Sequence, residues 1–342
     1  MPRRSTGQTR AKNDKIGVLI INLGTPDATD YFSVRRYLNE FLSDTRVIDY
    51  PSWKWQPILQ SIILTFRPFK AGAAYKSIWN NKKNESPLKT HTRAQCTKLK
   101  KAFKDEHPNI EFEWGMRYGN PSIARGIDAL HAKGCQKILF LALYPQYSAC
   151  TTATAYDKAF EHLKTLSHQP AARTVPSWYK DPQYIDALAN TITTAIEKLD
   201  KNPQVILTSF HGIPKRYTDK GDPYYHHCIE TSDLVRKKLK WTKDKWEATF
   251  QSRFGPEEWL QPYTSETLSS LAQKGVKRIA VLSPAFVSEC IETLEEIEIK
   301  EKEDFLNAGG EEFTYIPCLN ESPAHIDLLS DLIKREMSGW IN

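Results

Sequence analysis

Six short apolar runs, each followed by turn residues and then by a segment of helical periodicity, constrain the fold of this chain most strongly. They span residues 16–23, 112–116 and 138–143 in the first half and 205–210, 246–250 and 279–282 in the second. Strands buried on both faces of a parallel sheet read as continuous apolar runs, whereas half-exposed strands alternate. The repeated strand, turn and helix order therefore predicts the α/β class with parallel sheets.

The 342 residues are enough for two such units of roughly 150 residues each. We expect a basic arm at 1–14, one α/β domain at 15–165, a second at 175–320 and a C-terminal helix at 321–342. The joint falls near 165–180, and an amphipathic segment at 184–199 precedes the second set of runs. A composition of 40% hydrophobic and 26% charged residues argues against a disordered or low-complexity protein.

The charge and the cysteines narrow the functional class. Residues 1–15 contain five basic side chains and one acidic one, so they supply +4 of the net charge of +6 and leave +2 for the rest. We expect this arm to be disordered and the body of the protein not to bind nucleic acid. The six cysteines include no CxxC pair, which fits a reduced compartment and argues against a zinc ribbon or a cysteine-ligated cluster.

Polar and aromatic residues gather where the runs end. Ligands of parallel α/β sheets bind beyond the carboxyl ends of the strands, and these ends read NLGTP, RYGNP, YPQYS, SFHGIP, QSRFGP and LSPAF. Proline and glycine are common at such exits, but they do not explain the histidine, arginine and tyrosines found there. A GxGxxG turn and a Walker phosphate loop are both absent, which argues against NAD and ATP chemistry.

Two groups with acid–base or metal-binding chemistry lie near strand ends in the second half. At about 100° per residue, a helix after Phe286 places Glu289, Glu292 and Glu296 on one face. A Glu-rich face is usually solvated, but this helix begins at the edge where a pocket should open. His211 ends the run 205–210. A neutral imidazole accepts a proton or binds a divalent metal, and carboxylates bind cations or carry protons, so both roles stay open.

Several long motifs occur in a fixed order: GVLIINLGTPD, RYGNP, LYPQYSACTTAT, SFHGIPKRYTDKGDPY, TFQSRFGPEEWLQPYT and LSPAFVSECIETLEEI. On these motifs the sequence resembles the ferrochelatase family over nearly its whole length. The resemblance implies two Rossmann-like domains with parallel sheets and a porphyrin cleft between them. It also implies a lyase that inserts Fe(II) into protoporphyrin IX with release of two protons, the last step of haem biosynthesis.

The resemblance assigns roles to individual positions. His211 is similar to the family's active-site histidine, Glu292 to its partner across the porphyrin centre and Glu296 to the next carboxylate of an acidic path. The first two are the expected catalytic residues, and all three are candidate metal ligands. Whether the histidine takes protons or meets the metal stays open. The candidate substrate-binding residues are Leu23, Arg117, Tyr118, Tyr144 and Trp259. Leu23 stands where the coproporphyrin-using branch has a tyrosine, which favours protoporphyrin IX.

Residues 51–72 resemble the apolar lip of the family's cleft. Between 53 and 69, tryptophans, isoleucines and phenylalanines stand beside Lys54 and Arg67, a composition that suits a segment lying in a membrane interface. We expect a cytoplasmic enzyme with peripheral contact at the inner face of the cytoplasmic membrane. Protoporphyrinogen oxidase or a haem acceptor is a candidate partner.

The sequence also departs from the family. Members that contain an iron–sulfur cluster have a cysteine directly after YPQYS, whereas Ala149 stands there here and Cys150 is displaced by one. We therefore expect no such cluster and no permanently bound cofactor, with Fe(II) as a substrate. The family's GSPL loop reads NESPL at 84–88, and Cys290 replaces a histidine. Two alternatives stay open: a related chelatase for another metal or for coproporphyrin, and a non-catalytic bilobed tetrapyrrole-binding protein.

Overall fold

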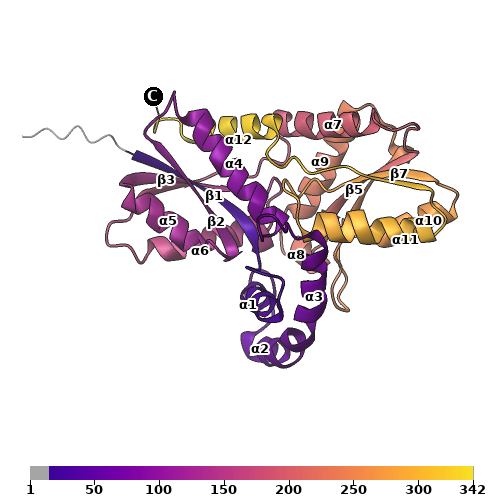
Figure 1. The fold of residues 1–342 in the computed structure, drawn as a ribbon, viewed down its shortest axis with the longest axis horizontal. Helices are drawn as coiled ribbons and strands as arrows, with labels where there is room; N and C mark the ends of the chain where they lie inside the picture. The colour runs from indigo at the N-terminus through magenta and orange to yellow at the C-terminus, as the bar shows by residue number, and fades with distance from the viewer. Residues whose placement is uncertain (1–14, 342) are drawn as a thin grey trace, which may run out of the picture.

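The computed structural model describes residues 15–341, so the predicted arm at 1–14 lies outside the described residues. Within them the strands form two parallel sheets with the orders β2-β1-β3-β4 and β6-β5-β7-β8 (Figure 1). The strands are β1 (Lys15–Thr25), β2 (Ile110–Gly119), β3 (Cys135–Ala142), β4 (Ala171–Thr174), β5 (Val205–His211), β6 (Trp246–Gln251), β7 (Arg278–Leu282) and β8 (Glu312–Tyr315). The predicted α/β class with parallel sheets is confirmed.

The sequence analysis did not predict two of the strands. β4 and β8 are edge strands of four residues, with the sequences AART and EFTY, and neither forms an apolar run. Such short edge strands carry little periodic signal because they are only partly buried. β4 pairs with Lys137–Phe140 of β3. The segment 165–180, expected only to join the two halves, therefore contributes a strand to the first sheet.

Helices cover both faces of each sheet. They are α1 (Tyr31–Leu42), α2 (Ser52–Ile58), α3 (Leu64–Ile78), α4 (Pro87–Phe103), α5 (Ile123–Ala132), α6 (Thr154–Leu163), α7 (Pro182–Ile196), α8 (Lys215–Asp219), α9 (Tyr224–Lys238), α10 (Thr264–Gln273), α11 (Lys302–Asn307) and α12 (Pro323–Glu336), with π-helices η1 (Leu59–Ile63), η2 (Ala149–Ala153) and η4 (Glu292–Glu301) and the 3₁₀-helix η3 (Lys243–Lys245). α4 lies on one face of the first sheet, and α5 and α6 lie on the other (Figure 1).

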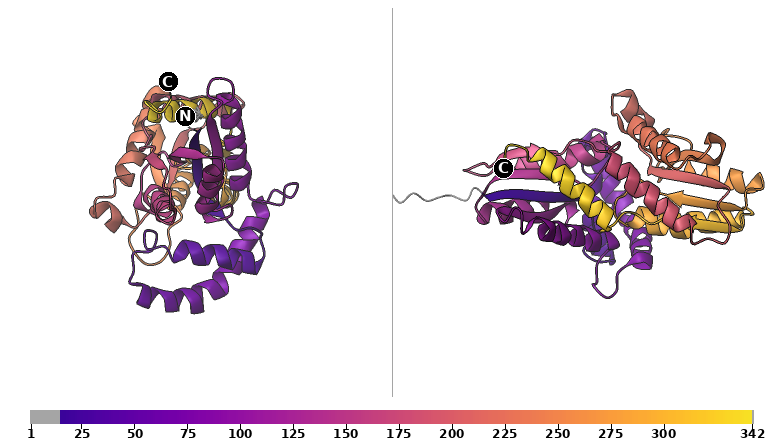
Figure 2. Two further views of the ribbon diagram at one scale, coloured as in Figure 1. Left: turned by 90° about the vertical axis from the view of Figure 1, so that its left-hand side faces the viewer. Right: turned by 90° about the horizontal axis from the view of Figure 1, so that it is seen from above.

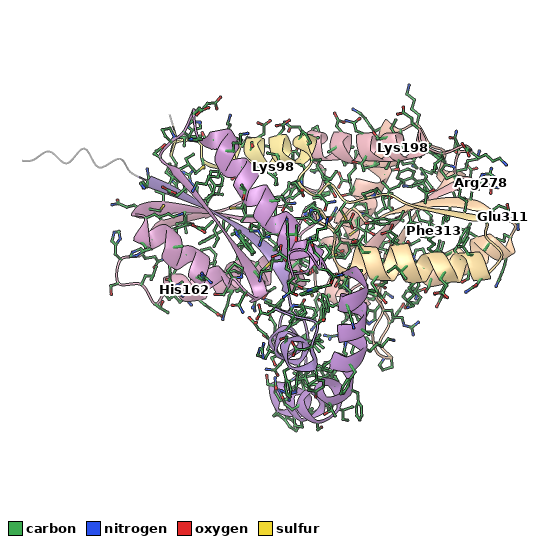
Figure 3. The ribbon with its side chains drawn as sticks, in the orientation of Figure 1. Lys98, His162, Lys198, Arg278, Glu311 and Phe313 are labelled. Atoms are coloured by element: carbon green, nitrogen blue, oxygen red, sulfur yellow. The ribbon has the colours of Figure 1, made fainter. Side chains whose placement is uncertain are left out.

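One apolar core runs through both halves. It joins Val18 and Leu139 of the first sheet to Ile206 and Ala280 of the second, through apolar side chains of α7 and α12. α12 packs against α4, β3 and α7, so the last helix crosses back over the first half (Figure 2). Side chains fill the junction, whereas Lys198, Arg278 and Glu311 lie at the far end of the second half (Figure 3).

The segment 51–72 projects from the junction as the helices α2, η1 and the start of α3, beside α1 (Figure 1). We call residues 51–72 the lip. Its inner side packs through Leu59 and Leu64, which are fully buried, whereas Trp53, Phe66 and Phe69 are exposed. Among residues 15–341, no helix has both the length and the apolar character needed to cross a bilayer.

Candidate active site

His211 is the last residue of β5, and its ring is partly buried. Its Nδ1 lies 2.6 Å from the carbonyl oxygen of Gly212. Because a carbonyl only accepts, Nδ1 is the donor of this hydrogen bond, and Nε2 is the ring nitrogen left to act on a substrate. A side chain at Gly212 would come within 2.9 Å of the Gln251 carbonyl oxygen and 3.1 Å of the Trp259 ring. Glycine at this position lets the turn pack tightly enough to aim the imidazole.

Glu292 is the first residue of η4 and is partly buried. Burial raises the pKa of its carboxyl group, and the charge of a protonated His211 lowers it, so the two side chains are within electrostatic reach of each other. Glu292 also lines a small cavity together with Leu23, Tyr37 and Tyr75. The structure thus brings Glu292 of the second half next to the predicted Leu23 of the first.

Glu296 is tied to the loop after β6. It accepts hydrogen bonds from the backbone N–H of Ser252 at 2.8 Å and from the Ser252 hydroxyl at 2.6 Å. Gln251 Nε2 donates to the backbone oxygen of Glu292 at 2.7 Å and lies 3.3 Å from Glu296 Oε2. These bonds fix the first turn of η4 against β6.

The predicted three-carboxylate face is wrong for Glu289. This residue precedes η4, and its carboxylate accepts from the Thr293 hydroxyl at 2.5 Å, the Tyr315 hydroxyl at 2.7 Å and the Cys318 N–H at 2.9 Å. These three hydrogen bonds hold the Glu289 carboxylate away from the candidate site. The α-helical layout also fails beyond Glu292, because η4 is a π-helix whose i→i+5 bonds widen each turn.

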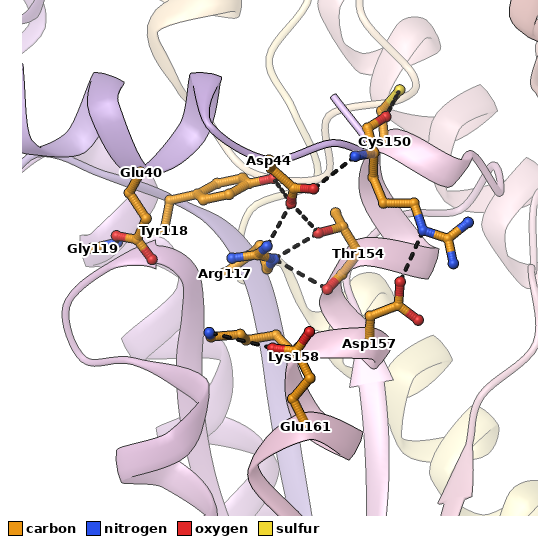
Figure 4. Close-up of polar contacts among 11 residues, drawn as sticks. Glu40, Asp44, Arg117, Tyr118, Gly119, Cys150, Thr154, Asp157, Lys158 and Glu161 are labelled. Atoms are coloured by element: carbon orange, nitrogen blue, oxygen red, sulfur yellow. Dashed lines mark hydrogen bonds and ion pairs between the residues drawn. The ribbon is translucent and has the colours of Figure 1, made fainter. Parts of the chain in front are cut away.

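Arg117 and Tyr118 meet at Asp44 rather than at the small cavity (Figure 4). Arg117 Nη2 lies 2.5 Å from Asp44 Oδ2, and the fully buried Tyr118 donates to the same oxygen at 2.8 Å. Arg117 Nε also donates to the Thr154 hydroxyl at 2.7 Å. Burial would raise the pKa of the Asp44 carboxyl, but hydrogen bonds from Thr154, the Arg46 N–H and Tyr118, together with the Arg117 charge, lower it. This network anchors the chain just before the lip.

Tyr144 and Trp259 each carry a polar atom without a partner. The Tyr144 hydroxyl and the Trp259 Nε1 are buried, and neither has a hydrogen bond within the described part of the chain. Burial raises the pKa of Tyr144, and the charges of Arg117 and Glu292 both reach it. The Trp259 ring centre lies 6.4 Å from that of His211. Unsatisfied buried donors of this kind are uncommon in folded proteins.

The sequence prediction missed Arg67 as a site residue and placed it at a membrane surface. Arg67 lies on α3 with its Nη1 buried and without a partner among residues 15–341. Burial lowers the pKa of its guanidinium, the charges of Tyr37 and Tyr75 oppose this, and the group stacks 4.6 Å above the Phe254 ring. An arginine inside an apolar helical segment was the signal in the sequence. A buried donor atom without a hydrogen-bond partner is costly, so Nη1 of Arg67 is an unusual feature of this segment.

The cavity beside Glu292 measures about 10 Å³. That is room for about one water molecule, whereas cavities that enclose a drug-sized ligand measure roughly 300–1,000 Å³. A macrocycle does not fit into this cavity as it stands. Among residues 15–341, no group of three His, Cys, Asp or Glu side chains is placed to hold a metal ion.

Solved structures with the same fold are chelatases. SirB from Bacillus subtilis, solved with Fe³⁺, matches 96% of this chain and 99% of its own at a TM-score of 0.57 and 11% identity. The sirohydrochlorin chelatase SirB from Bacillus subtilis subspecies spizizenii, in complex with cobalt, matches 96% of this chain and 95% of its own at a TM-score of 0.51 and 10% identity. At such identities the likeness concerns the fold alone.

Sequence relatives are much closer. The chain is 55% identical to the ferrochelatase of Agrobacterium fabrum over 96% of this chain and 95% of the relative, and 55% identical to that of Rhizobium meliloti over 96% of each. The ferrochelatase of Brucella ovis is 54% identical over 97% of this chain and 94% of its own length. The ferrochelatase family profile matches residues 15–337. The chain therefore belongs to the ferrochelatase family, the metal chelatases of haem synthesis.

Proposed function

We propose that this chelatase inserts Fe(II) into protoporphyrin IX between the exit of β5, the start of η4 and the Leu23 wall. The electrostatic interaction of His211 with Glu292, which itself lies beside Leu23, supports the proposal most directly. Two pyrrole N–H protons must leave as the metal enters the ring. The His211 Nε2 lone pair and the Glu292 carboxylate are the two acceptors, and burial makes Glu292 a stronger base than an exposed glutamate.

Fe(II) is a substrate in this proposal. His211, Glu292 and Glu296 are not placed to hold a metal ion together, but they offer imidazole and carboxylate groups that a divalent first-row metal can contact in turn during its transfer. Glu296 follows Glu292 by one turn, and its bonds to Ser252 hold it in place. From this position Glu296 delivers the metal to His211 and Glu292 or carries protons away from them. The geometry of His211 and Glu292 stays fixed meanwhile.

The porphyrin binds through unsatisfied groups of both halves. The free hydroxyl of Tyr144 and the free Nε1 of Trp259 face its edge, and Arg67 takes a propionate carboxylate, since a buried guanidinium without a partner favours an anion. The apolar Leu23 matches the vinyl-bearing ring of protoporphyrin IX better than the more acidic coproporphyrin. Arg117 and Tyr118 contribute by holding Asp44 and the chain that leads to the lip.

Anaerobic mixing of the protein with protoporphyrin IX and Fe(II), or Zn(II) as a surrogate, tests this function through the loss of free-porphyrin fluorescence. We expect turnover by the wild type and a decrease of about 10²-fold or more for His211→Ala and for Glu292→Gln. Glu298→Gln, which changes an exposed carboxylate of the same helix, is the matched control and keeps its rate. An inactive wild type, or active variants at both positions, would contradict the proposal.

We also propose that the enzyme works without an iron–sulfur cluster. The described cysteines are all free thiols in separate segments of the chain, and the Cys150 thiol donates to the Arg46 carbonyl oxygen at 3.2 Å. Iron and acid-labile sulfide measured on anaerobically purified protein check this directly. Stoichiometric sulfide would contradict it.

The exposed face of the lip supports peripheral contact with the cytoplasmic membrane. Trp53 is 75% exposed, Ile62 57% and Phe66 69%, which is unusual for large apolar side chains that gather on one segment. Lys54 lies 5.0 Å from the Trp53 ring, and a cation beside tryptophan is typical of interfacial helices. Such a location would let the lip receive an apolar porphyrin from lipid.

A further inference from the structure

Arg216 connects three segments that are far apart in the sequence. It lies on α8, one short turn beyond His211. Its Nε bonds to the Glu257 carboxylate in the loop that carries Trp259, and its Nη1 donates to Asp49 Oδ2 at 2.8 Å, just before the lip. Its guanidinium also lies 5.7 Å from the ring of Tyr50. A planar guanidinium can make these contacts at once, which a lysine ammonium cannot.

The His211 turn and the Trp259 loop form one wall. Backbone hydrogen bonds join them, from Gly212 N–H to Gln251 at 2.8 Å, from Lys215 N–H to Glu258 at 3.0 Å and from Leu260 N–H to Ile213 at 3.0 Å. Pro214 and Trp259 pair directly as a β-bridge. The bond from Arg216 to Glu257 extends this set of contacts by one side chain. A contact that fixes Arg216 therefore also fixes the His211 turn and the Trp259 loop.

The other partner of Arg216 belongs to the chain that leads into the lip. Asp49 Oδ2 also accepts from Lys220 Nζ. Tyr217, next to Arg216 and nearly buried, donates its hydroxyl to the Val47 carbonyl oxygen at 2.9 Å and accepts from the Asp49 N–H at 3.3 Å. Residues 47–49 directly precede α2. The contacts of Asp49 thus cross from the chain that leads into the lip to the wall of the second half.

We propose that Arg216 is a positioning residue whose ion pair with Asp49 latches the lip against the His211 and Trp259 wall and limits how fast a porphyrin leaves. The inference rests on the function proposed above. The side chains of Asp49 and Arg216 are 47% and 29% exposed. Exposed ion pairs are individually weak, so this latch opens and recloses readily. Because Arg216 joins the wall that carries His211 and Trp259 to the chain before the lip, breaking its pair with Asp49 frees one side of the proposed porphyrin site from the other.

Release kinetics test the latch in the full-length protein. Enzyme loaded with protoporphyrin IX is mixed in a stopped-flow instrument with an excess of apomyoglobin, and the porphyrin transfer rate is followed by fluorescence. We expect Arg216→Gln and Asp49→Asn each to release porphyrin roughly three- to tenfold faster than the wild type. The effects of the two substitutions should be less than additive in the double variant, because the Asp49–Arg216 pair is lost in each single variant. Raising the ionic strength should bring the wild type towards the variants.

Asp233→Asn is the matched control, because Asp233 also pairs with two cations, Arg236 at 2.6 Å and Lys237 at 2.7 Å, but within the single helix α9. It should keep the wild-type release rate, which separates a latch from a general loss of surface ion pairs. Wild-type rates in both single variants, or effects that add in the double variant, would overturn the latch while leaving metal insertion intact. A wild type that binds no porphyrin would overturn the proposed function and the latch together.

Discussion

Glu301, in the last turn of η4, carries a carboxyl group whose Oε2 is buried without a hydrogen-bond partner in the described part of the chain. Burial raises the pKa of this group to about 7, the charge of Glu296 adds to the shift, and Lys300 opposes it. The folded protein therefore holds the proton more tightly than the unfolded chain does, whose glutamate pKa is about 4.3. A glutamate of this kind stabilises the fold only while it is protonated.

This raised pKa predicts a pH-dependent stability. The contribution of Glu301 is fully present below about pH 4.5 and is lost as the pH rises through about 7, a change on the order of 3 kcal/mol. Glu301→Gln should remove that dependence and be more stable than the wild type at pH 8. Urea unfolding between pH 5 and 8 measures it. Glu303→Gln, which changes an exposed neighbour, should retain the wild-type slope.

Asp44 offers a second prediction at the scale of single residues. The side chains of Asp44 and Arg117 are only 7% and 12% exposed, so Asp44→Asn leaves a nearly buried guanidinium without its counter-ion. We expect a loss of about 3–5 kcal/mol in the free energy of unfolding, measured with urea. Asp157→Asn is the control, since its pair with Arg46 is 46% and 45% exposed and should cost about 1 kcal/mol or less. Equal losses in the two variants would contradict this account.

The proposed membrane contact depends on the exposed surface of the lip. Trp53→Ala combined with Ile62→Asp removes one exposed apolar side chain and charges the position of another. Flotation with anionic liposomes should recover the wild type in the lipid fraction and leave this variant in solution. Phe160→Asp changes a 40% exposed side chain on α6, away from the lip, and should float like the wild type. A wild type that stays in solution would contradict membrane contact.

The sequence predicts the position of η4 but not its helix type. Its start next to a strand exit was predictable, and so was the meeting of His211 with Glu292, because both follow strands of one parallel sheet. Its π-helical winding was not, because that winding depends on contacts across the fold: Gln251 holds the Glu292 carbonyl and Ser252 holds Glu296. The same holds for Arg67, whose guanidinium lies over the ring of Phe254 from the other half.

At the scale of the whole molecule, the apolar runs predicted both parallel sheets, and the structure repeats one strand order in each. The sequence did not reveal how closely the halves are joined. Arg173, beside the expected joint, donates to the backbone oxygens of Glu336 and Ser338 at 2.9 Å each, and Lys334 pairs with Glu106 at 2.9 Å. These contacts bring the end of the chain onto the first half. Long-range packing of this kind has no local sequence period.

The shared core leads to a prediction about unfolding. Because α12 contributes to one core that spans both sheets, residues 15–341 should unfold as a single cooperative unit, with equal calorimetric and van't Hoff enthalpies and coincident circular-dichroism and tryptophan-fluorescence transitions. Ile333→Ala, in that core, and Leu268→Ala, in a cluster confined to the second half, should each lower the free energy of unfolding by about 2–5 kcal/mol and shift the entire transition. Two separate transitions, of which Leu268→Ala moves only one, would show instead that the halves fold as independent domains.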